Sequence, residues 1–130
     1  MRYICMSLLL AVLCPVVALA AEVTASLTQG PGGSGRSFVR VANNSTDAIM
    51  PVNPSQWDHL ISLEANATLT GGTWTVYAKT DGGQWQALSG TISGSAISPV
   101  MIEGVTTSAL KIVPSGIPQD CSWNATVKSR

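Results

Sequence analysis

The side chains with reactive chemistry are few, and their spacing forms no catalytic set. His59 is the only histidine of the chain, so the usual zinc site with two or three imidazoles cannot be built in one chain. Asp58 precedes it, but adjacent residues of a strand point to opposite faces, which is poor geometry for a base and the group that orients it. We therefore expect a surface pair or a pair at the start of a strand.

Two carboxylates, Glu64 and Glu103, are the candidates for a glycosidase pair, which needs a separation of about 5 to 10 Å. Glu64 falls on the polar side of an alternating segment, and nothing in the sequence places Glu103 beside it. We expect both to be solvated. No serine lies in a Gly-x-Ser-x-Gly elbow. The sequence predicts no enzyme, and no cofactor or metal.

The segment Gly30–Ser37 is close to the phosphate-binding loop motif but has Arg36 where that motif needs lysine. The motif holds phosphate at the start of a helix. Because residues 38–41 have the pattern of a strand, the segment is interpreted as a flexible glycine-rich connector.

Aromatic and amide side chains indicate a recognition surface instead. Trp57 lies in a proline-containing segment typical of a loop, and Tyr77 is expected beside Gln84 and Gln86 on the polar face of a hairpin. Such side chains suit sugar stacking and hydrogen bonding, so a carbohydrate-binding module is an alternative function. The structural alternative is that Trp57 caps one end of the fold.

The first twenty residues have the pattern of an export signal. Arg2 supplies the positive start, residues 4–20 carry no charge, and Ala18-Leu19-Ala20 is the small-x-small pattern of a cleavage site. We predict a cleavable signal peptide over residues 1–20. A retained anchor is less favoured, because the run contains Pro15 and lacks a basic stop.

Charge and cysteine content bound the class of the mature chain. Without Arg2, six of the seven basic residues remain against seven acidic ones, so no electrostatic attraction to nucleic acid or membrane is predicted. Cys121 is the one cysteine outside the leader. We expect a buried, inert thiol, the alternative being a disulfide between chains.

Apolar residues recur at every second position, which predicts strands. In residues 61–69 the apolar set alternates with polar residues, and residues 121–128 repeat the pattern with Cys121 and Trp123 on one side. Further strands are predicted at residues 23–28, 37–42, 97–102 and 109–113. The pattern predicts an all-β fold, an antiparallel β-sandwich of the jelly-roll or immunoglobulin-like kind.

The hairpin Thr73–Leu88 is the clearest local signal. A two-residue turn within Asp81-Gly82-Gly83 places Trp74 and Trp85 on the same buried face, whereas a three-residue loop pairs Trp85 with Lys79 and sends apolar groups to water. We therefore predict the two-residue turn, with both tryptophans in the core.

This hairpin resembles the "strand, DGG, W, strand" unit of small β-sandwich domains on bacteriophage particles and in secreted bacterial adhesion modules. Residues 102–105, 110–112 and 114–117 are similar to the closing strands of such domains, so the resemblance covers residues 60–117. It implies a sandwich that acts by surface contacts.

The prediction is a signal peptide (residues 1–20), an N-terminal strand with the glycine-rich connector (21–36) and a β-sandwich domain (37–130). We expect an exported protein, in the periplasm, outside the cell or on a virion. Its function would be that of a non-catalytic structural or adhesive module, with carbohydrate binding as the alternative. The expected partners are protein subunits of a surface or virion assembly, further copies of the chain, or a glycan.

Overall fold

The computed structural model describes residues 21–42, 44–66, 72–93, 99–118 and 121–130. The predicted signal peptide, residues 1–20, lies outside the described residues. Within the described ranges, no helix is long and apolar enough to span a bilayer.

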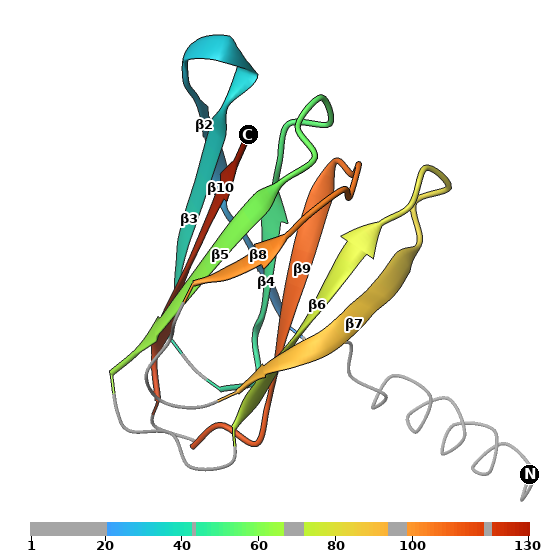
Figure 1. Cartoon of the computed structure of the whole chain (residues 1–130). Helices are drawn as coiled ribbons and strands as arrows, with labels where there is room; N and C mark the ends of the chain where they lie inside the picture. Colours follow the sequence, from blue (N-terminus) through green and yellow to red (C-terminus); the bar gives the residue numbers. More distant parts are fainter. Residues whose placement is uncertain (1–20, 43, 67–71, 94–98, 119–120) are drawn as a thin grey trace, which may run out of the picture.

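Two five-stranded sheets pack face to face, which confirms the predicted β-sandwich (Figure 1). Sheet A has the order β1 (Glu22–Thr24), β4 (Asp47–Pro51), β9 (Ala109–Ser115), β6 (Thr73–Lys79) and β7 (Trp85–Ser93). Sheet B has the order β2 (Ser26–Gln29), β3 (Gly35–Val41), β10 (Trp123–Ser129), β5 (His59–Ala65) and β8 (Val100–Ile102). Of the described strand pairs, only β1 with β4 is parallel.

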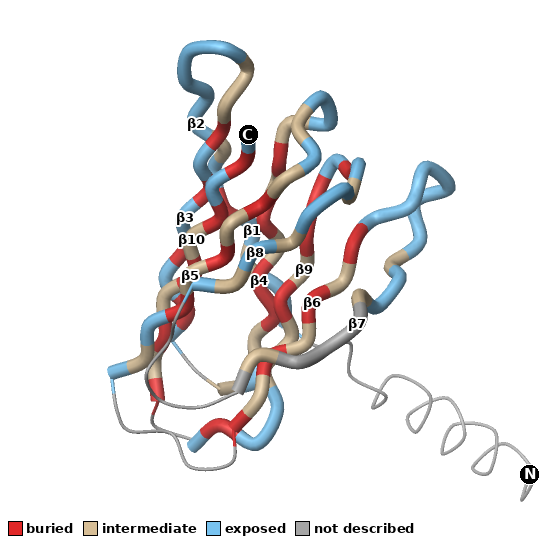
Figure 2. The backbone as a smooth tube through the Cα atoms, viewed as in Figure 1, coloured by how far each residue is buried: buried red, intermediate tan, exposed pale blue. Residues whose placement is uncertain are grey.

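The core lies between the sheets and follows the period-two pattern, because alternate side chains of a strand point to opposite faces. Burial alternates along the central strands, as the red and pale segments of Figure 2 show. Trp74 of β6 and Trp123 of β10 are fully buried and meet edge to face, with ring centroids 6.1 Å apart. This contact joins the two sheets at the centre of the core. The Trp74 indole N–H has no hydrogen-bond acceptor among the described residues.

The N-terminal segment contributes to both sheets. One continuous strand was predicted over residues 23–28, but the chain crosses between the sheets at the buried Ala25, whose N–H donates to the Ile49 carbonyl at 2.8 Å. β1 then extends sheet A and β2 extends sheet B. The glycine-rich segment is the loop of the β2–β3 hairpin, with a short 3-10 turn at Pro31–Gly33.

β4 is a strand that the sequence patterns did not predict. It pairs with the central strand β9 and buries Ala48 and Met50 in the core. Its apolar run is short and ends in Pro51, so local periodicity gives little signal. The strand forms because two neighbours, β1 and β9, satisfy its backbone groups.

The predicted turn of the β6–β7 hairpin is wrong. Lys79 pairs with Trp85 and Tyr77 with Ala87, while the Thr80 N–H donates to the Gln84 carbonyl at 2.7 Å. The loop therefore has three residues and ends in Gly83 at φ +82°, a left-handed conformation that glycine adopts without strain. As a result Trp85 lies on the outer face of sheet A rather than in the core.

The β2–β3, β4–β5, β6–β7 and β8–β9 loops gather at the end of the sandwich where the chain terminates (Figure 1). Hydrogen bonds connect these loops. The Asn53 side chain of the β4–β5 loop donates to the Gly33 carbonyl of the β2–β3 loop at 3.0 Å, and the Val105 N–H of the β8–β9 loop donates to the Trp57 carbonyl of the β4–β5 loop at 3.0 Å. This loop end and the outer faces of the two sheets are the surfaces available for recognition.

Candidate functional site

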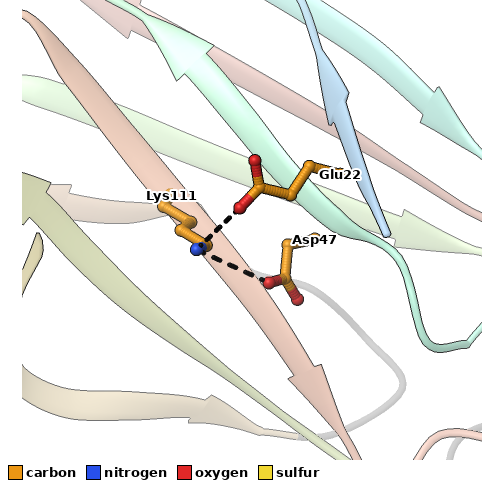
Figure 3. Close-up of polar contacts among 3 residues, drawn as sticks. All are labelled: Glu22, Asp47 and Lys111. Atoms are coloured by element: carbon orange, nitrogen blue, oxygen red, sulfur yellow. Dashed lines mark hydrogen bonds and ion pairs between the residues drawn. The ribbon is translucent and has the colours of Figure 1, made fainter. Parts of the chain in front are cut away.

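A polar cluster lies on the outer face of sheet A. The Lys111 ammonium of β9 is 3.0 Å from a Glu22 oxygen and 3.7 Å from an Asp47 oxygen (Figure 3). The two carboxylates come from β1 and β4, which pair in parallel with Glu22 opposite Asp47. Because like charges opposite each other repel, the ammonium between them holds this edge of the sheet together.

Trp85 completes the cluster. Its ring centroid lies 5.5 Å from the Lys111 ammonium and 6.0 Å from that of Lys79, both within the range of cation–π attraction. Tyr77 is the register partner of Lys111 and lies on the same face. Sequence reasoning missed this site, because the wrong register placed Trp85 in the core and because Glu22, Asp47 and Lys111 are far apart in the chain.

Burial is the main cause of the shifted pKa of Asp47. The carboxyl is largely removed from water, which raises its pKa above the ordinary value of 3.8. The Lys111 charge opposes this rise and the Glu22 carboxylate adds to it. The lysine therefore only partly offsets the loss of hydration at Asp47.

The four predicted recognition residues do not gather on one face. Trp57 lies in the β4–β5 loop with 63% of its surface exposed, and Gln84 is exposed at the hairpin loop. Tyr77 is half-buried on the outer face of sheet A. Gln86 pairs with the buried Ala78, so it points to the side opposite Tyr77. The expected placement of Tyr77 beside Gln86 is therefore wrong, and its cause is the register of the hairpin.

A hollow of about 520 Å³ opens at the loop end. Its walls come from the β4–β5, β6–β7 and β8–β9 loops and include Pro54, Lys79, Asp81 and Thr107. The Thr107 hydroxyl oxygen lies 2.8 Å from the Lys79 carbonyl and 2.9 Å from the Ala109 carbonyl, and its single proton is shared between these two acceptors, which fixes one wall. The hollow combines a carboxylate, an ammonium and hydroxyls, a set able to bind polar ligands.

His59 is the first residue of β5, which agrees with the expected position at the start of a strand. It is buried, so the alternative of a surface position is wrong. Its Nε2 lies 2.8 Å from the Val105 carbonyl, which can only accept, so Nε2 carries the proton. The Ser129 hydroxyl, 2.7 Å from Nδ1, then donates to that nitrogen. Serine, imidazole and acceptor follow in the order of a catalytic triad, but both side chains are buried and face the core. The arrangement serves packing.

The remaining candidates are where the sequence placed them. Glu64 and Glu103 are exposed, and Cys121 is buried with its thiol 3.5 Å from the Ser122 carbonyl. The segment after the glycine-rich loop is the strand β3, not a helix, so the phosphate-binding geometry does not form. Among the described residues, no three His, Cys, Asp or Glu side chains gather as metal ligands would.

No protein-family profile and no curated protein sequence matches this chain. Solved structures with a similar fold include a family 29 carbohydrate-binding module in complex with cellulohexaose, at 10% identity and a TM-score of 0.44, covering 81% of this chain and 75% of that one. A Bacillus endospore appendage protein, described as forming disulfide-linked pili, shares 13% identity over 87% of this chain and 96% of its own, with a TM-score of 0.41.

A periplasmic inhibitor of g-type lysozyme from Aeromonas hydrophila shares 9% identity over 84% of this chain and 96% of its own, with a TM-score of 0.41. At such identities and TM-scores, these similarities assign no activity, and the functional argument rests on this chain's own surfaces.

Proposed function

We propose that the chain is a non-catalytic, exported module, displayed on a cell or virion surface, that assembles with other protein subunits through the edge strand β7. The observation that carries the proposal is the length and chemistry of that edge. β7 has nine residues, lies at the rim of sheet A (Figure 1), and pairs only with β6 among the described strands.

The other sheet edges differ from β7. β1, β2 and β8 have three, four and three residues, and short edges offer few unpaired backbone groups to another chain. β7 (WQALSGTIS) contains no charged residue and no proline, which are two of the means by which proteins block edge pairing. Its register with β6 shifts between Thr75 and Tyr77, so the edge is regular on either side of that irregularity. A strand of this kind is suited to pair with an extended segment of a second subunit.

Charge on the edge tests the proposal. Ala87 is exposed on β7, opposite Tyr77, so Ala87→Lys places an ammonium on the edge without touching the core. Ala42→Lys, at another exposed alanine just after β3, is the matched control. We expect light scattering on the size-excluded protein to show assembly for the wild type and Ala42→Lys, and a loss of assembly for Ala87→Lys. A wild type that is monomeric at high concentration would overturn the proposal, as would equal assembly of both variants.

Carbohydrate binding is the second candidate, and the exposure of Trp57 at the loop end favours it. A tryptophan with 63% of its surface in water suits stacking against a sugar ring, and the polar hollow opens at the same end of the sandwich. We expect Trp57→Ala to abolish retention on insoluble polysaccharide and Trp57→Phe to keep part of it. Retention that is unchanged in Trp57→Ala would remove this candidate.

A further inference from the structure

The outer face of sheet B carries basic side chains that the sandwich itself does not neutralise. Arg36 and Arg40 of β3 and Lys128 of β10 are exposed on this face, and Glu64 of β5 is the one acidic residue there among the described strand positions. None of the three cations forms an ion pair with a described residue. This face is thus positive although the whole chain has a formal charge of zero.

Arg36 and Lys128 are direct register partners across the β3–β10 pair. Like charges opposite each other on an exposed face destabilise a sheet, and their other cross-strand neighbours, Thr28 and Leu60, carry no charge. Glu64 lies too far along the sheet to help: its row holds Asn124 and Arg40, and the Arg40 Nε already donates to the Asn124 Oδ1 at 3.3 Å. An anion between Arg36 and Lys128 would relieve the repulsion.

The surface is hollowed on both sides of Lys128. One hollow of about 290 Å³ is lined by Arg36, Lys128, Thr28 and Ser34, and another of about 190 Å³ by Lys128, Leu60 and Met101. Asp58 and Arg130 also line the second, where the Asp58 carboxylate accepts the Gly104 N–H at 3.3 Å. Charged and apolar walls therefore meet at Lys128.

Phe38 lies between the two arginines on the same strand and is 47% exposed. Same-face neighbours along a strand are roughly 7 Å apart, so β3 presents guanidinium, phenyl ring and guanidinium in a line. This order matches a polymer that alternates apolar ring faces with anionic groups.

We infer that the outer face of sheet B binds a linear acidic polysaccharide, with its carboxylates held by Arg36, Lys128 and Arg40 and a sugar ring stacked on Phe38. This inference is independent of assembly through β7, which belongs to the other sheet.

Titration calorimetry with polygalacturonate tests the inference, with dextran as the uncharged comparison. We expect binding of polygalacturonate that weakens as salt is added, and no binding of dextran. The double variant Arg36→Gln/Lys128→Gln should bind at least tenfold more weakly, and Phe38→Ala severalfold more weakly. Ser115→Asp, which lowers the net charge by one at an exposed position of the other sheet, should bind as the wild type does.

A folding defect is separable from a binding defect, because relief of the Arg36–Lys128 repulsion predicts an unchanged or higher melting temperature for the double variant. Failure of polygalacturonate to bind at low salt would overturn the inference, and so would equal binding by the double variant. Equally tight binding of a single-stranded oligonucleotide or of anionic lipid vesicles would assign the face to a different partner and would also overturn it.

Discussion

Lys79 and Trp85 are register partners on the outer face of sheet A, with the lysine ammonium 6.0 Å from the centroid of the indole ring. This pairing is the one that a two-residue turn would have excluded. Trp85 is half-buried, and the ammonium groups of Lys79 and Lys111 both lie within cation–π range of its ring. These contacts stabilise the indole on the outer face of the sheet, outside the core.

The two tryptophans of the hairpin, Trp74 and Trp85, should contribute differently to the free energy of unfolding. Trp74 is fully buried against Trp123, so Trp74→Ala is expected to lower the free energy of unfolding by about 3 to 5 kcal/mol. Trp85→Ala removes only surface contacts and should cost about 1 kcal/mol. Urea denaturation measures both. Similar losses for the two variants would mean that Trp85 belongs to the core after all.

The turn itself is testable with two adjacent glycines. Gly83 has φ +82° and Gly82 does not have a positive φ, while an added methyl group would meet nothing closer than 3.9 Å at either position. Gly83→Ala is therefore expected to destabilise the fold by about 1 kcal/mol through backbone strain alone, and Gly82→Ala by much less. Thermal unfolding compares them. If Gly82→Ala were the more harmful change, the three-residue loop would be contradicted.

The raised pKa of Asp47 predicts how the stability of the fold depends on pH. Its pKa is raised in the folded protein by burial, so the folded state keeps the proton to a higher pH than the unfolded chain does. The contribution of this group to stability is therefore greatest below the ordinary pKa of 3.8, which applies to the unfolded chain, and it falls as the pH rises through the folded value.

We expect the stability of the wild type relative to Asp47→Asn to decrease between about pH 3 and neutrality, measured by urea denaturation. Glu22→Gln, which alters the more exposed partner of Lys111, is the comparison. An increase of the relative stability with pH would show that the attraction of Lys111 outweighs the loss of hydration.

The hydrogen bond from Ser129 to the buried His59 is expected to stabilise the fold. Ser129→Ala removes the donor to Nδ1 and leaves a buried acceptor without a partner, so the free energy of unfolding should fall by about 1 to 3 kcal/mol. Ser115→Ala, at an exposed position of β9, is a control expected to have little effect. A neutral result for Ser129→Ala would indicate that water or another group replaces the hydroxyl.

Cys121 is expected to be unreactive while the protein is folded. Its thiol is buried, so a thiol reagent should modify it only after unfolding, and the protein should run as a monomer on a non-reducing denaturing gel. A covalent dimer that disappears in Cys121→Ser would contradict this.

The candidate surfaces were only partly predictable. The loop position of Trp57 follows from the prolines around it, which favour a loop, whereas its exposure was one of two alternatives that the sequence left open. The Lys111 cluster did not follow, because its charges come from three strands whose pairing is non-local. The basic face of sheet B likewise depends on Lys128 pairing with Arg36, which lies far away in the chain.

Local alternation was sufficient to determine that the chain is built of strands and which side of β5 and β10 is buried, because a period of two depends only on neighbouring residues. Tertiary structure decided the rest: the register of the β6–β7 hairpin, the existence of β4, and the partners of His59 and Lys111. Each of these depends on which strand lies alongside, and a shift of one residue in a turn reverses the face of every side chain that follows it.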